Sequence, residues 1–89
     1  MHVIHKYTLE ILTSQSVYMP VRAEILTVQV QHGQICLWAM LPRPNEPISP
    51  RKILMYGTGH AIQENGKYIG TIQLEDGALV LHVFEGYSI

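Results

Sequence analysis

The chain has 89 residues, of which 47% are hydrophobic and only 15% charged, and its formal net charge at pH 7 is -1. This length predicts one β domain, residues 1–89, because such a chain buries somewhat over roughly 60% of its unfolded surface in a single core. The near-neutral charge gives no field for generic DNA binding. Average domains are about 25% charged, so we expect apolar surface to remain for a partner, most simply another copy of the chain.

Cysteine usage and hydropathy disfavour two further classes of protein. Cys36 is the only cysteine, so no disulfide can form within the chain, and its apolar neighbours indicate a buried small side chain. No apolar stretch reaches the ~18 residues of a membrane-spanning helix, and the first residues alternate like a strand, unlike a signal peptide. We therefore expect a soluble, cytoplasmic protein with no membrane partner.

The pattern of apolar residues in the first half of the chain predicts β-strands. Apolar residues alternate over residues 3–11, and residues 16–19 form a short extended piece that ends at Pro20. The longest pattern, residues 24–41, predicts a hairpin with His32-Gly33 in its turn, because Gly readily adopts positive φ. Its second strand is apolar at both parities, which is typical of a strand covered on both faces, so we expect Trp38 to be mostly buried.

Proline then interrupts the β pattern. Residues 42–52 contain four of the five prolines together with Arg43, Arg51 and Lys52. Because proline removes backbone donors and makes the preceding residue extended, this segment predicts an exposed, proline-rich basic loop. A short strand over residues 53–56 is expected to follow it.

Hairpin signals return in the last third. Asn65-Gly66 and Asp76-Gly77 each suit a type I′ turn, and strands are expected over residues 68–75 and 78–85. Together these elements predict an all-β fold, a small antiparallel β-sandwich or barrel of six or seven strands built from hairpins. The expected core comprises Leu26, Val28, Val30, Leu37, Ile72, Leu79, Leu81 and Val83.

Catalytic and metal-binding patterns are weak. The five histidines form no close ligand motif, although strand pairing could bring His5 and His82 together. No serine lies in a nucleophile-elbow pattern, and the carboxylates fall mainly at turns and strand ends. We therefore expect no enzyme activity, no metal and no cofactor.

The most distinctive stretch is the glycine turn that consists of Tyr56, Gly57, Thr58, Gly59 and His60. Two glycines around a threonine allow close backbone approach and leave N–H groups available, as in small anion-binding concavities. Equally, they suit a β-bulge or a strand that crosses between sheets.

The nearby cations extend this hypothesis. If the proline-rich loop folds back, Arg43, Arg51 and Lys52 could share a phosphate-bearing ligand with the glycine turn, with Tyr56 stacking on its base. The other aromatic residues that could stack on it are Tyr18, Tyr68 and Trp38, of which Trp38 is expected in the core. The alternative is a solvated loop with ordinary surface charges.

Several segments together resemble a known family. Residues 24–31, 35–39, 56–60, 68–71 and 77–85, in this order, resemble short proteins encoded by bacteriophages and prophages and grouped as a domain of unknown function. The family segment that corresponds to residues 42–51 is variable, and no catalytic residues are assigned. The resemblance implies a viral protein in the host cytoplasm.

This resemblance and the residues together suggest two functions. In the first, a homo-oligomeric, non-enzymatic anti-defence protein binds and sequesters a nucleotide-derived signal through Arg51, Lys52 and the glycine turn. In the second, the proline-rich loop binds a host protein and inhibits or modulates it, and the glycines only turn the chain.

Overall fold

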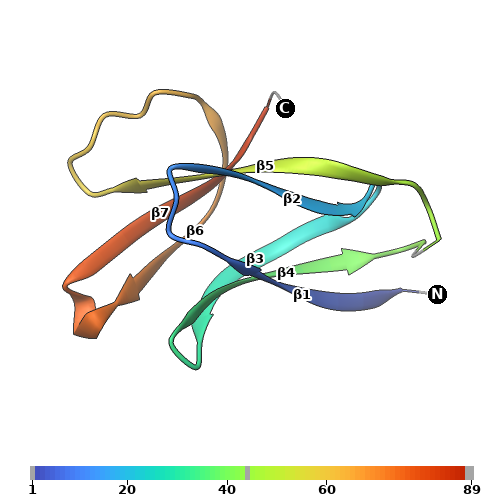
Figure 1. Ribbon diagram of the computed structural model, residues 1–89, viewed down its shortest axis with the longest axis horizontal. Coiled ribbons are helices and arrows are strands. Elements are labelled where there is room, and N and C mark those ends of the chain that lie inside the picture. The colour runs from blue at the N-terminus through green and yellow to red at the C-terminus, as the bar shows by residue number, and fades with distance from the viewer. Residues whose placement is uncertain (1, 44, 88–89) are drawn as a thin grey trace.

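The computed structural model describes residues 2–43 and 45–87, which form seven strands in two antiparallel sheets (Figure 1). The elements are β1 (Val3–Leu9), β2 (Ser14–Pro20), β3 (Glu24–Gln31), β4 (Gln34–Leu41), β5 (Ile48–Gly57), β6 (Gly66–Leu74), the 3-10 turn η1 (Glu75–Gly77) and β7 (Leu79–Gly86). One sheet has the order β1-β4-β3 and the other β2-β5-β7-β6, which confirms the all-β sandwich. In the described residues, no helix is long and apolar enough to cross a membrane.

The core lies between the two sheets and follows the alternation of the strands. Of the eight predicted core residues, five are buried, and Val30 and Leu79 are partly buried against them. The fully buried side chains include Leu37 and Leu41 of β4, Ile53 of β5 and Val83 of β7. Each sheet therefore contributes one apolar face to a single core.

One prediction about the central hairpin was wrong. Leu26 is 41% exposed, because β3 has a bulge between Ile25 and Thr27 that removes Leu26 from the regular alternation. Trp38, by contrast, is mostly buried as expected, although it pairs with Lys6 and Thr27 on the outer face of its sheet, opposite to Leu37 and Ala39. β4 is central in its sheet, but only one of its faces packs against the other sheet.

Two of the three predicted hairpins are confirmed. His32 and Gly33 have φ values of 52° and 76° and join Gln31 to its ladder partner Gln34. The Asp76-Gly77 turn joins β6 to β7, although it is longer than a two-residue turn, since Leu74 pairs with Leu79.

The Asn65-Gly66 hairpin was wrong, since β7 lies between β5 and β6 in the sheet. Gly66 instead begins β6, where an added Cβ would lie 2.5 Å from the backbone oxygen of Glu85. The glycine is thus needed for close strand approach and not for a turn. Residues 58–65 form a longer loop that arches away from the end of the molecule that holds the N-terminus (Figure 1).

The prediction of an irregular proline-rich loop holds for residues 42, 43 and 45–47, while Pro44 lies outside the described residues. It fails from residue 48 onward, because β5 already begins at Ile48 and Pro50 pairs with Tyr18. From residue 48 to residue 52, β5 pairs with β2 alone, and β7 joins only from Ile53 onward. On the unpaired side a proline nitrogen forfeits no ladder bond, so a strand tolerates proline there.

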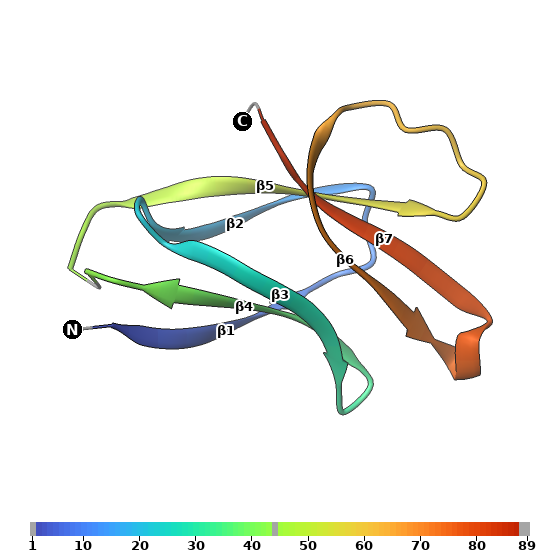
Figure 2. The same ribbon diagram turned by 180° about the vertical axis from the view of Figure 1, so that it is seen from behind.

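The edge strands β3 and β6 lie side by side without ladder pairing (Figure 2). β6 also has a bulge, between Tyr68 and Gly70, and an added Cβ at Gly70 would lie 3.0 Å from the Cγ1 of Val28. The absence of a side chain at Gly70 therefore lets the two sheets approach closely along this edge.

The core assignment is tested with matched isoleucines. Ile53 is 0% exposed and Ile11 is 59% exposed. Ile53→Ala should lower the free energy of unfolding by about 2–5 kcal/mol through lost burial and a residual cavity, whereas Ile11→Ala should change it by less than about 0.5 kcal/mol. Urea unfolding measures both, and Ile53→Val, expected to cost about 0.5–1.5 kcal/mol, serves if the alanine variant does not fold. Equal effects at Ile53 and Ile11 would contradict the packing.

Candidate functional site

The predicted glycine turn lines a pocket at the end of the four-stranded sheet. Tyr56 and Gly57 end β5, and Thr58, Gly59 and His60 continue directly into the β5–β6 loop. The pocket has a volume of about 220 Å³, and it is completed by Ile62, Tyr68, His82 and Phe84. Five of the seven predicted ligand-binding residues therefore share one concavity.

The glycine turn is a β-turn and not a bulge. The His60 backbone N–H donates to the Gly57 carbonyl oxygen at 3.1 Å, and Gly59 has a φ of 85°, as the third position of a type II turn requires. An added Cβ on Gly57 would lie 2.9 Å from the Cε1 and Nδ1 atoms of His60. Gly57 therefore leaves the space that the His60 ring occupies.

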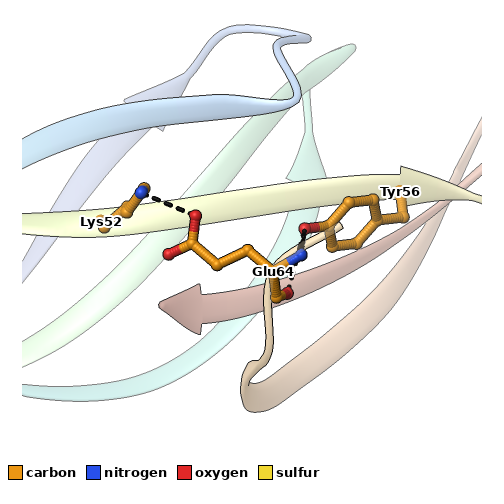
Figure 3. Close-up of polar contacts among 3 residues, drawn as sticks. All are labelled: Lys52, Tyr56 and Glu64. Carbon is orange, nitrogen blue, oxygen red and sulfur yellow. Dashed lines mark hydrogen bonds and ion pairs between the residues drawn. The ribbon is translucent and has the colours of Figure 1, made fainter. Parts of the chain in front are cut away.

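Glu64 fastens the β5–β6 loop onto the outer face of β5 (Figure 3). Its carboxylate accepts a bond from the Lys52 ammonium at 2.7 Å. The Tyr56 hydroxyl accepts from the Glu64 backbone N–H at 3.2 Å and donates to the Glu64 carbonyl oxygen at 3.1 Å. Beneath this contact, called here the Glu64 anchor, Leu54 is fully buried although it lies on the outer face. The anchor thus holds the loop that forms one wall of the pocket.

Three aromatic rings form the apolar part of the pocket. Phe84 packs edge-to-face against Tyr56, with ring centroids 6.0 Å apart, and against Tyr68, with centroids 5.5 Å apart. Tyr56 is buried, whereas Tyr68 is 55% exposed. The ring open to a ligand is therefore Tyr68, and Tyr56 supports the loop.

A chain of hydrogen bonds links three pocket residues, Thr58, His82 and Tyr68, through Thr71, which lies outside the pocket lining. His82 bonds through Nε2 to the Thr58 hydroxyl at 2.7 Å and through Nδ1 to the Thr71 hydroxyl at 3.0 Å. Thr71 also bonds to the Tyr68 hydroxyl at 2.6 Å. Both ring nitrogens of His82 are engaged, so this residue fixes the pocket, whereas the exposed His60 ring makes no hydrogen bond within residues 2–43 and 45–87.

The pair Thr58 and His82 has the spacing of a nucleophile and a base, but it differs from a catalytic triad. In a triad, a carboxylate behind the histidine stabilises the imidazolium that forms. Here the second nitrogen bonds to the Thr71 hydroxyl, which carries no charge. The Thr58–His82 pair therefore lacks the charged third member of a triad.

The two predicted cations lie outside the pocket. Arg51 is on the core-facing parity of β5, where its Nε donates to the Glu85 carboxylate at 2.6 Å and its Nη1 to the Ala23 carbonyl oxygen at 2.9 Å. It lines a different and larger cavity of about 380 Å³ between β3 and β6. Lys52 shares the outer face of β5 with Tyr56 but is engaged by Glu64. The structure thus separates Arg51 from the glycine turn.

His82, Phe84, Thr71 and Ile62 were missed by the sequence interpretation. The Asp76-Gly77 turn sets a register in which Thr71 pairs with His82, and strand alternation then places His82 and Phe84 on one face. The sequence therefore contained the turn and the alternation that bring Thr71, His82 and Phe84 together. Ile62 lies in an irregular loop, and no periodicity could place it.

Histidines and carboxylates do not gather into a ligand set. In the described part of the chain, no group of three or more His, Cys, Asp or Glu residues could hold a metal ion. His5 lies in β1 of one sheet and His82 in β7 of the other, so the strand pairing does not join them.

Comparison with known proteins gives one match. Residues 1–88 match the domain of unknown function DUF7352. The chain belongs to the DUF7352 family. No curated protein and no solved structure matches it. The DUF7352 match covers the whole sandwich and thus includes every residue of the pocket.

The Glu64 anchor is tested by Tyr56→Phe. This change keeps the ring against Phe84 but removes the hydroxyl from both backbone groups of Glu64. Amide hydrogen exchange over residues 58–65 should become faster, and the free energy of unfolding should fall by about 1 kcal/mol. Tyr18→Phe, at an exposed tyrosine of β2, is the matched control and should change neither. Unchanged exchange in the Tyr56 variant would show that the hydroxyl does not hold the loop.

Proposed function

We propose that this DUF7352 protein is a non-enzymatic, homo-oligomeric binding protein that sequesters a nucleotide-derived small molecule. The nucleobase occupies the pocket formed by the glycine turn, Tyr68, His82 and Phe84. As a phage- or prophage-encoded protein in the host cytoplasm, it would act against a host defence signal. Sequestration of such a signal requires affinity and no turnover.

The proposal is supported mainly by a pocket that is lined with aromatic side chains and has the exposed His60 ring at its side. Most ligand pockets combine apolar walls with a few polar groups that fix orientation. Here Tyr68 and Phe84 supply the walls, and His60 and the Thr58 hydroxyl supply donors and acceptors. Aromatic side chains stack on any nucleobase, and each such contact contributes about 1–3 kcal/mol.

The size of the pocket limits what enters it. A volume of about 220 Å³ lies below the ~300–1,000 Å³ that is typical of sites for drug-sized ligands. It therefore accommodates one ring system, and the sugar and phosphates of a nucleotide extend outside.

The charges near the pocket support recognition of the base more than of the phosphate. Arg51 is bound by Glu85 on the core-facing side, and Lys52 is bound by Glu64. Neither cation is free to neutralise a phosphate at the glycine turn. We therefore expect selectivity to come from the base, with His60 as the nearest partner for a polar edge.

A thermal-shift screen tests the proposal. The probes are cyclic dinucleotides, cyclic ADP-ribose isomers, nucleoside monophosphates and free nucleosides. A ligand at 100 times its Kd should raise the free energy of unfolding by about 2.7 kcal/mol. If none of these compounds changes the melting temperature and a host protein is retained through residues 42–52, the protein is an inhibitor of that host protein and the sequestration proposal is wrong.

Variants of pocket residues test whether a compound that raises the melting temperature binds in this pocket. Tyr68→Ala and His60→Ala should each weaken binding of a hit compound by roughly ten-fold or more, through lost stacking and a lost polar contact. His5→Ala removes an exposed histidine of the other sheet and should leave the affinity unchanged. Isothermal titration calorimetry measures these values, and equal affinity in all three variants would place the ligand elsewhere.

A further inference from the structure

The cavity of about 380 Å³ between β3 and β6, called here the inter-sheet cavity, is distinct from the pocket at the glycine turn. The bulges of β3 and β6 both border it. Leu26 and Ile69 are the residues without a ladder partner at these bulges, and both line the cavity. Bulges redirect side chains and are frequent beside functional sites, so two bulges at one cavity favour a binding role.

Arg51 spans this cavity from one sheet to the other. Its Nε donates to the Glu85 carboxylate of β7 at 2.6 Å, and its Nη1 donates to the carbonyl oxygen of Ala23, just before β3, at 2.9 Å. These two bonds fix the plane of the guanidinium, and the side chain is only 20% exposed. The Nη2 atom makes no hydrogen bond with any described residue and is not sealed from solvent. Arg51 thus offers two oriented N–H donors that the fold itself does not use.

Lys67 adds a second positive charge on the same side of the sheet. It pairs with Glu85, which pairs in turn with the core residue Ile53, so the register places Lys67 on the core-facing parity of β6. Glu85 is bound by Arg51, and Lys67 is exposed and makes no ion pair within residues 2–43 and 45–87. The Lys67 ammonium is therefore available at the solvent-exposed part of the cavity lining.

The charges of the lining match a ligand with one negative charge. Arg51 and Lys67 are cationic and Glu85 is anionic, so these core-facing groups carry one net positive charge. Glu24 is the other charged residue of the lining, but it pairs with Met40 on the outward-facing parity of β3. A carboxylate balances the core-facing charges, whereas a doubly charged phosphate leaves an excess of negative charge.

The remaining walls of the cavity are apolar. Ile25 and Ile69 pack partly against the core, and Leu26 is 41% exposed, so aliphatic side chains border the charged groups. The volume lies near the lower end of the ~300–1,000 Å³ that is typical of small-molecule sites, whose walls are mostly apolar with a few polar groups that fix orientation. The ligand that fits both parts has an acidic head and a short apolar chain.

We propose that the inter-sheet cavity binds a small organic monocarboxylate with an apolar chain. The carboxylate accepts hydrogen bonds from Arg51 Nη2 and from the Lys67 ammonium. The chain lies against Ile25, Leu26 and Ile69, where its removal from water favours binding. This site goes beyond the proposed nucleobase site and is separate from it, so each can fail without the other.

A series of straight-chain acids tests the proposal on the full chain. The probes are acetate, butyrate, hexanoate and octanoate, and amide chemical shifts of the ¹⁵N-labelled protein measure their binding. Saturable shifts are expected over residues 23–26 and 67–69, and the Kd should fall by up to about four-fold for each buried CH₂ group. Octan-1-ol has the chain without the charge, and inorganic phosphate has charge without the chain. Both should bind at least about ten-fold more weakly than octanoate.

Charge variants connect this binding to the two cations. Lys67→Gln should raise the octanoate Kd by roughly ten-fold, whereas Lys6→Gln, with the same change in charge at a lysine of β1, should leave it unchanged. Arg51→Lys keeps the charge but lacks the Nη2 donors, and it should also raise the Kd by roughly ten-fold. If the Arg51 variant does not fold, the comparison of the two lysine variants decides.

The nucleobase site supplies a further control. His60 lines the glycine-turn pocket and not the inter-sheet cavity, so His60→Ala should leave the octanoate Kd unchanged. Tyr68 lines both cavities and is therefore left unchanged in these variants. The proposal would be overturned by the absence of saturable shifts up to about 10 mM octanoate, by equal Kd values in the Lys67 and Lys6 variants, or by octan-1-ol or phosphate binding as tightly as octanoate.

Discussion

Burial of β5 on both faces is the constraint on which the rest of the structure depends. Four consecutive residues, Ile53, Leu54, Met55 and Tyr56, are buried. Ile53 and Met55 pack in the core between the sheets, while Leu54 and Tyr56 face outward and need a cover that no second layer provides. The β5–β6 loop supplies that cover through the Glu64 anchor (Figure 3). The pocket forms because this loop folds back onto the outer face of β5 and its residues become one wall of the pocket.

The outer face of β4 is covered only in part. β4 is equally apolar in sequence and equally central in its sheet. On its outer face Cys36 is buried and the Lys6 side chain crosses from β1 to bond Gln31 of β3, whereas Trp38 and Met40 are half-buried. The two sheets therefore differ: the four-stranded sheet bears the pocket at the glycine turn, and the outer face of the three-stranded sheet carries mainly polar side chains around Trp38 and Met40. A pocket with apolar walls and a few polar groups suits a small ligand.

Local chemistry explains which features could be predicted from the sequence. The turns at His32-Gly33 and Asp76-Gly77 depend on residues that tolerate positive φ, and the strands around them follow simple alternation. Alternation along β5 also places Arg51 and Tyr56 on opposite faces of the sheet. The prediction that both residues line one site was therefore inconsistent with the sequence pattern itself. The bulge at Leu26, the role of Gly66 in strand approach and the Glu64 anchor depend on contacts between segments far apart in the chain. No local pattern contains that information.

The central claim is that the pocket at the glycine turn receives a nucleobase, and amide chemical shifts locate such an event most directly. The measurement is a titration of the ¹⁵N-labelled protein with adenosine or guanosine monophosphate. We expect saturable shifts at Gly57, Thr58, Gly59 and His60, together with Tyr68 and His82, and none in β1 or β4. Shifts confined to Arg51, Lys67 and Glu85, which line the larger cavity between β3 and β6, or no shifts at millimolar nucleotide, would contradict the claim.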